Sequence, residues 1–148
     1  MQFIQGNDRH QTYFITLEDR VSADNPVSLI DAFIDKLDLE KLGFNKNMHK
    51  SEGRPPYAAA VLLKLYLYGY LDKIRSSRKL AKECSRNTEL QWLLQSLHPN
   101  YHTIAGFRKL HPLPLQSMFR LYVQFLSDAD LPGKTTIAVD GSKFKADT

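Results

Sequence analysis

The sequence has little cysteine: Cys84 is the single thiol among 148 residues. One thiol cannot form an internal disulfide or complete a cysteine-based metal site, and its place on an apolar helical face favours a small core residue over a nucleophile. The absence of disulfides is typical of a reducing compartment. The first residues also lack the cationic and apolar stretches of a signal peptide, so we expect a cytoplasmic protein.

Several signatures of catalysis and membrane insertion are missing too. The sequence contains no glycine-rich phosphate-binding loop and no Ser/His/Asp motif. His98 and His102 are four residues apart, but Pro99 between them disfavours a shared helical face for a metal. The apolar stretch over residues 57–71 contains Lys64 and is shorter than the roughly 20 residues that cross a bilayer. We therefore expect no membrane partner, and we predict that this stretch is the central helix of a core.

Positive charge is concentrated in the middle of the chain. Residues 53–111 contain ten Lys or Arg and three Asp or Glu, whereas residues 1–52 contain six and nine, and residues 112–148 contain four of each. A basic segment beside a slightly acidic one is typical of a surface that binds a polyanion, most often nucleic acid. A solvated surface would have the same composition, so composition leaves both interpretations open.

The most informative pattern lies in residues 75–87. Small or apolar residues recur there with helical spacing and predict one narrow apolar face: Ser77, Leu80, Ala81 and Cys84. The opposite face is predicted to carry a basic stripe of five cations at i, i+3, i+4, i+7 and i+11: Arg75, Arg78, Lys79, Lys82 and Arg86. Glu83 lies outside this stripe. Like charges at these spacings repel one another, and a polyphosphate neighbour would remove the cost of that repulsion.

Helical periodicity extends over most of the chain. The helix over residues 88–97 is predicted to begin with a capping box formed by Thr88 and Gln91. The sequence Pro112-Leu113-Pro114 is predicted to break the chain before the last helix. We predict an extended arm over residues 1–23, a loop over 44–54, and helices over 26–37, 38–42, 57–71, 88–97, 101–110 and 115–127.

The helix predicted over residues 101–110 has a composition that is compatible with a DNA-recognition helix. Ile104 and Phe107 are expected to point inward, and the outer face is predicted to carry His102, Thr103, Gly106 and Lys109. Short helices, tight turns and basic outer faces are what a helix-turn-helix DNA reader needs, although many helical bundles share this periodicity.

The pattern changes near the C-terminus. Residues 135–139 are predicted to form a strand, Asp140-Gly141 a turn, and residues 142–146 a second strand of a hairpin. One hairpin is not stable alone, so we expect a helical domain over residues 1–127 and the start of a second domain over 134–148.

Five blocks of the chain carry a resemblance to a known family: residues 24–44, 53–57, 67–70, 75–80 and 102–108. In this order they resemble the N-terminal domain of bacterial insertion-sequence DDE transposases of the InsH type. An ordered series of blocks is a more specific signal than any single motif. In that family a helical domain precedes an RNase H-like catalytic domain. The resemblance therefore implies a mainly α fold, a helical bundle with a helix-turn-helix-like DNA-binding portion, followed by a β-hairpin fragment of the RNase H-like domain.

The resemblance also implies a metal-binding role for Asp140. In position and context this residue matches the first of the three acids that hold two Mg²⁺ ions for strand cleavage and joining in the family. One carboxylate cannot hold that metal pair, and residues 146–148 depart from the usual continuation. We therefore expect a truncated transposase that binds no Mg²⁺ stably and does not catalyse. A turn former is the alternative role for Asp140.

The leading hypothesis is thus the DNA-binding part of a transposase, with the terminal inverted repeats of the element as its DNA partner. The alternatives are a stand-alone helix-turn-helix regulator or transposition inhibitor, and a helical protein-interaction module. The sequence leaves open whether the chain forms a homodimer. The candidate DNA-binding residues are Arg75, Arg78, Lys79, Lys82, Arg86, His102, Thr103, Arg108 and Lys109, and the candidate catalytic and metal-binding residue is Asp140.

Overall fold

The computed structural model describes residues 2–44 and 57–129. In these two ranges the chain forms helices and no strand, which confirms the predicted mainly α bundle. The predicted hairpin over 134–148, with Asp140, lies outside the described residues, as does most of the predicted loop over 44–54. The helices are η1 (Glu18–Arg20, a 3-10 helix), α1 (Val27–Lys36), α2 (Leu39–Leu42), α3 (Ala59–Leu71), α4 (Ser77–Arg86), α5 (Thr88–Leu93), α6 (Tyr101–Leu110) and α7 (Pro112–Asp128).

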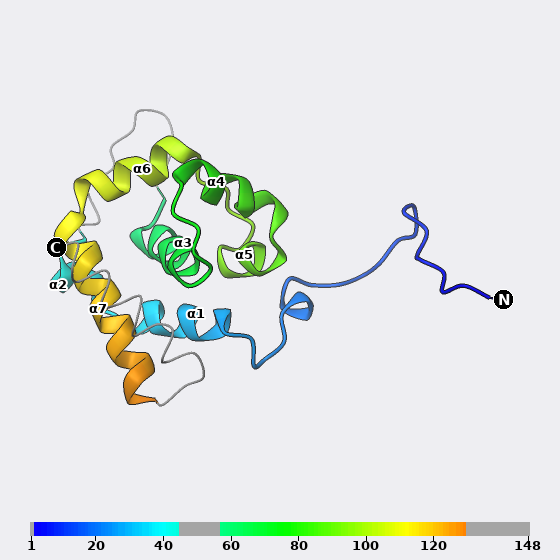
Figure 1. Cartoon of the computed structure of the whole chain (residues 1–148), viewed down its shortest axis with the longest axis horizontal. Helices are drawn as coiled ribbons and strands as arrows, with labels where there is room; N and C mark the ends of the chain where they lie inside the picture. Colours follow the sequence, from blue (N-terminus) through cyan, green and yellow to red (C-terminus); the bar gives the residue numbers. More distant parts are fainter. Residues whose placement is uncertain (1, 45–56, 130–148) are drawn as a thin grey trace.

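Helix α3 is the centre of the core, as its apolar composition predicted. It lies in the middle of a ring formed by the other helices (Figure 1). Its buried side chains follow one another around the helix, from Leu62 and Leu63 to Tyr68. The one charged side chain of α3, Lys64, reaches two carboxylates of α1, with its Nζ 2.7 Å from Asp31 and 3.0 Å from Asp35. A nearly buried lysine is thereby paired rather than isolated.

Side-chain hydrogen bonds mark the starts of α1 and α2, and a glycine marks the end of α2. The Asn25 side chain accepts a hydrogen bond from the backbone N–H of Val27 and begins α1. Asp38 caps α2 by accepting from the N–H of Lys41, and Gly43 ends α2 with a φ of 108°. A side chain there would be strained and would also approach Pro114 of α7 at 2.9 Å. This glycine lets α2 pack against α7.

The helix predicted over 88–97 begins at Thr88 as predicted, but its cap and its C-terminal end differ from the prediction. Asn87, not Thr88, is the N-cap, and its side chain accepts from the N–H of Leu90. The side chain of Gln91 donates to the carbonyl of Ser85 and so forms no capping box. The helix ends at Leu93, and Gln95 and Ser96 then adopt left-handed conformations. Leu97, beyond them, is 40% exposed.

The prolines of residues 112–114 begin α7 instead of breaking the chain ahead of it. Pro112 occupies the first position of the helix, where proline has the correct φ and no hydrogen-bonding N–H is needed. The chain bends at the preceding residue, the buried His111, whose ring lies against those of Phe107 and Phe44. The helix predicted over 115–127 is confirmed, and its buried residues are Leu115, Met118, Tyr122 and Leu126.

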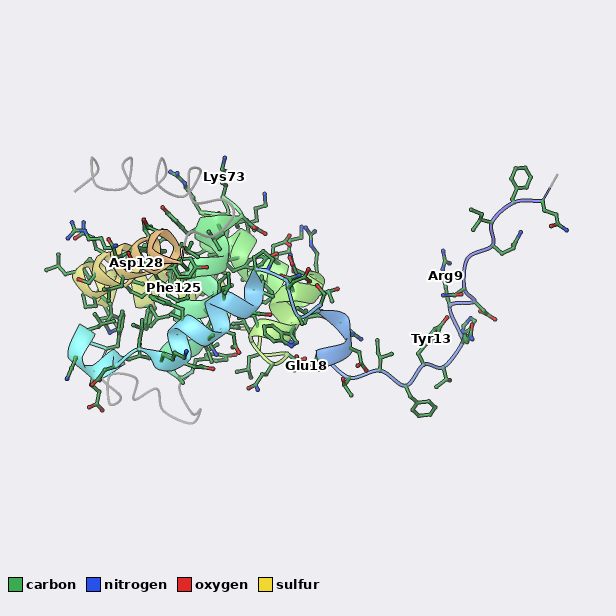
Figure 2. The ribbon with its side chains drawn as sticks, turned by 90° about the horizontal axis from the view of Figure 1, so that it is seen from below. Arg9, Tyr13, Glu18, Lys73, Phe125 and Asp128 are labelled. Carbon is green, nitrogen blue, oxygen red and sulfur yellow. The ribbon has the colours of Figure 1, made fainter. Side chains whose placement is uncertain are left out.

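The N-terminal residues run outward from the bundle. Residues 2–17 contain no helix or strand, and the segment that carries Arg9 and Tyr13 extends away from the body (Figure 2). The arm joins the bundle at η1, where the Arg20 guanidinium donates to the side chain of Gln91. Among the helices of residues 2–44 and 57–129, none has the length and apolarity needed to cross a membrane.

Candidate nucleic-acid interface

The basic helix α4 begins where the chain turns tightly against α3. The N–H of Ile74 donates to the carbonyl of Gly69 at 2.7 Å, with Lys73 between them in a left-handed conformation. This is the hydrogen bond of a Schellman C-cap. A Cβ on Gly69 would lie 2.7 Å from the Ile74 carbonyl oxygen and 2.9 Å from Leu80. The lack of a side chain at this position therefore sets how closely α4 approaches the core.

Within α4 the two predicted faces are confirmed. The Ser76 side chain accepts from the N–H of Lys79 and caps the helix. Leu80 and Cys84 are 1% exposed, and Ser77 and Ala81 are half-buried beside them. Burial raises the pKa of the Cys84 thiol to about 11, which fits a core residue rather than a nucleophile. The stripe is shorter on the helix than predicted, because Arg75 precedes the N-cap Ser76 and lies in the turn before α4. All five cations are exposed: Arg75, Arg78, Lys79, Lys82 and Arg86.

One end of the stripe is partly neutralised. The Arg86 guanidinium lies 2.7 Å from the Glu83 carboxylate, one turn earlier in α4. The hydrogen bond from Arg86 lowers the pKa of the Glu83 carboxyl, with a smaller contribution from the charge of Lys79. The sequence placed Glu83 outside the stripe but did not predict this pair. The stripe therefore presents four cations and one ion pair rather than five equal charges.

Helix α6 packs against α4, and the two lie side by side in Figure 1. Its N-cap is Asn100, whose side chain accepts from the N–H of Thr103. The predicted inward residues Ile104 and Phe107 are buried. On its outer side His102, Arg108 and Lys109 are exposed, whereas Thr103 and Gly106, which were predicted to face outward, are half-buried.

Two arginines connect α4 with α6. Arg78 of α4 lies over the ring of Tyr101, with its Cζ 4.1 Å from the ring centroid. The Tyr101 ring also lies close to that of His102, at 4.0 Å between centroids. From α6, the Arg108 guanidinium donates to the carbonyl of Arg75 at 3.3 Å. The cations of two separate sequence segments thus form one surface, which we call the α4/α6 basic surface.

Arg108 also contacts the central helix of the core. Its Cζ lies 5.2 Å from the ring centroid of Tyr66 in α3. The Tyr66 hydroxyl in turn donates to the carbonyl of Ile104 in α6. Burial raises the pKa of the Tyr66 hydroxyl, and the charge of Arg108 partly opposes this shift. Arg108 therefore anchors α6 as well as adding charge.

Sequence reasoning missed Tyr101 and Tyr66 as parts of this surface. Tyr101 is separated from Arg78 by more than twenty residues, and helical periodicity reports only neighbours within one or two turns. An aromatic residue at the start of a predicted reading helix was the one available signal. It did not indicate which cation the ring would contact.

Metal-binding side chains do not gather in the described part of the chain. In residues 2–44 and 57–129, no three His, Cys, Asp or Glu side chains lie close enough together to hold a metal ion. Asp140, the predicted first acid of a Mg²⁺ site, lies outside these ranges. Its role stays a prediction from the sequence.

Comparison with known proteins adds a family assignment. Residues 15–110 match the family model described as Transposase domain (DUF772). The match contains η1 and α1 to α6, and so includes both helices of the α4/α6 basic surface. No curated protein and no solved structure matches the chain.

Proposed function

This chain belongs to the Transposase domain (DUF772) family, and on that premise we propose that it binds DNA through the α4/α6 basic surface. Its role would be that of the N-terminal, DNA-binding part of an insertion-sequence transposase of the InsH type. The DNA target would be the terminal inverted repeats of the element. Helices α4 to α6 would serve as a helix-turn-helix-like reader, with α6 supplying His102 and Lys109.

The observation that carries the proposal is the excess of exposed cations over carboxylates on two packed helices. Within the described residues, Glu83 is the one carboxylate that forms an ion pair with a member of the stripe. Lys79 and Lys82 are exposed and follow at i and i+3 along the outer side of α4. Their mutual repulsion costs stability in the free protein. Phosphates would remove that repulsion, and the release of condensed counterions would favour binding.

The catalytic part of the proposal rests on the sequence blocks alone. In a DDE transposase clustered acids hold the metal ions that activate the attacking oxygen and stabilise the leaving one. Asp140 would be the first of these acids. A lone carboxylate supplies one or two of the six oxygen ligands that Mg²⁺ takes, so further acids are needed for cleavage.

The direct test is a salt titration of DNA binding. Fluorescence anisotropy with a labelled duplex of about 25 base pairs would give the slope of log K against log salt. Neutralising Lys79 and Lys82 together, as Lys79→Gln/Lys82→Gln, should reduce this slope by about 0.9 for each lost phosphate contact. Binding to unrelated duplexes should weaken to the same extent, because phosphate contacts carry no sequence information.

A matched control removes the same charge elsewhere. Lys36 and Lys41 are exposed on α1 and α2, outside the two helices that carry the α4/α6 basic surface. The variant Lys36→Gln/Lys41→Gln should keep the wild-type slope. Equal losses in the two double variants, or no duplex binding by the wild type at low salt and about 100 µM protein, would contradict the proposal, since non-specific binding is expected at about 10⁻⁴ to 10⁻⁶ M.

A further inference from the structure

We infer that Arg78 is a specificity residue that reads a guanine base in the major groove, while its neighbour Lys82 contacts phosphate. The inference rests on the proposed DNA binding and adds to it a base-reading site. It differs from the expectation drawn from the sequence, which treated the five cations of the stripe alike.

The first step is the way in which Arg78 is held. Its guanidinium lies over the ring of Tyr101, 4.1 Å from the centroid, and the residue itself is exposed. Tyr101 is half-buried at the start of α6, and its ring also lies 4.0 Å from that of His102, so it supports the guanidinium from a helical position. Stacking occupies the flat face of a guanidinium and leaves the N–H groups at its edge available. Arg78 therefore combines a fixed plane with unused donors.

The second step is the contrast with two other arginines of this surface. The Arg86 guanidinium donates to Glu83, and that of Arg108 donates to the carbonyl of Arg75. In the part of the chain that the structure describes, the Arg78 guanidinium stacks on Tyr101 and donates no hydrogen bond. Its N–H donors are free for a ligand whose acceptors lie in one plane.

The third step concerns position. Arg78 contacts Tyr101 of α6, and Lys82 follows one turn later on the same side of α4, toward the C-terminal end of the helix. A side chain held at the contact between two helices lies toward the middle of the surface that they present to DNA, and a cation further along one helix lies toward the edge of that surface. Backbone contacts position a protein on DNA, and contacts to base edges give specificity.

The fourth step is chemical. A planar pair of N–H donors matches the O6 and N7 acceptors of guanine, which lie side by side in the major groove. The ammonium of a lysine cannot reproduce this fork, although it preserves the charge. Guanine is therefore the base that Arg78 would select. The competing interpretation is that the stacking only attaches α4 to α6.

The experiment selects binding sites from a duplex pool with about 16 random base pairs, using the whole 148-residue chain. Sequencing of the bound fraction gives the base preference at each position. Wild-type protein should enrich guanine at a defined position. Arg78→Lys should lose that preference and keep the others, and its affinity for the selected duplex should fall about tenfold while its affinity for a scrambled duplex stays unchanged.

Three further variants distinguish base reading by Arg78 from attachment of α4 to α6 and from a general effect of charge. Lys82→Gln should weaken binding to selected and scrambled duplexes equally and keep the guanine preference. Tyr101→Phe retains the ring and should preserve the preference, whereas Tyr101→Leu should lose it. Thermal unfolding of each variant shows whether it is folded.

Each remaining outcome counts against the inference. If Arg78→Lys keeps the guanine preference, or loses affinity equally for both duplexes, Arg78 is not a base reader. If the wild type binds all duplexes equally with a clear salt slope, DNA binding stands and the base-reading site is wrong. If the wild type binds no duplex, the proposed function and this inference both fail.

Discussion

Glu83 and Arg86 form an ion pair on α4, with 2.7 Å between the carboxylate and guanidinium, at the C-terminal end of a stripe of cations. The Glu83 side chain is 14% exposed and that of Arg86 is 56% exposed, so the arginine still reaches solvent. The Glu83 carboxylate therefore offsets one of the five positive charges of the stripe.

Glu83→Gln should strengthen DNA binding. The substitution leaves Arg86 without its carboxylate partner, so it adds a full cation to the α4/α6 basic surface. We expect affinity to rise about twofold to tenfold at low salt and the slope of log K against log salt to steepen by up to about 0.9. The measurement is the same anisotropy titration. An unchanged or weaker affinity would mean that Arg86 lies outside the DNA-binding surface.

The same pair predicts a pH dependence of stability. The pKa of Glu83 is lowered in the native protein by the hydrogen bond from Arg86. Its contribution is therefore present above the ordinary glutamate pKa and lost as the pH falls through the lowered native value. The difference in unfolding free energy between wild type and Glu83→Gln, measured by urea titration, should be largest near neutral pH and vanish in acid. A constant difference would contradict this sign.

Gly69→Ala should destabilise the protein, and Gly106→Ala should not. A Cβ on Gly69 would lie 2.7 Å from the Ile74 carbonyl oxygen, which cannot move without disturbing the turn into α4. We expect a loss of about 1–3 kcal/mol in unfolding free energy. Gly106 lies inside α6 with nothing within 4 Å of an added Cβ, so alanine there should add about 0.5–1 kcal/mol. Urea denaturation compares the two, and equal effects would be inconsistent with the close approach at Gly69.

Tyr68→Phe should lower the free energy of unfolding more than the same substitution at an exposed tyrosine. The Tyr68 hydroxyl donates to Glu89 and accepts from the side chain of Asn87, joining α3 to the start of α5. Its removal leaves partly buried polar groups without a partner, which costs about 1–3 kcal/mol. Tyr13→Phe in the arm, where the residue is 54% exposed, is the matched control and should change unfolding by less than about 0.5 kcal/mol. Similar losses in both variants would argue against the hydrogen-bonded network.

The Cys84 thiol should be unreactive in the native protein. It is 1% exposed, and burial raises its pKa to about 11. At pH 8 it is therefore protonated and inaccessible, and Ellman's reagent should modify it only as fast as the protein opens. Because the native pKa exceeds the unfolded one, this group's contribution to stability is complete below pH 9 and lost as the pH rises toward 11. Rapid modification without urea would show that the core does not cover this side of α4.

Several helices follow from the sequence because their signals are local. The spacing of Val27, Ile30 and Phe33 predicts the buried side of α1, and all three are buried. Leu80 and Cys84 likewise predict which side of α4 faces the core and therefore which side carries the cations. The cap of α5 was misplaced by one residue because Asn87 and Thr88 are both good capping residues, and the local pattern does not choose between them.

Sequence patterns are enough to predict the helical fold, the central position of α3 and the exposed basic side of α4, since each depends on the periodicity or the apolar composition of a single segment. Helix packing, in contrast, establishes that Arg78 stacks on Tyr101, that Arg108 attaches α6 to the turn before α4, and how closely α4 approaches Gly69. These contacts join residues far apart in the chain. Their partners are selected by the packing of whole helices, a property that spacing within one helix does not encode.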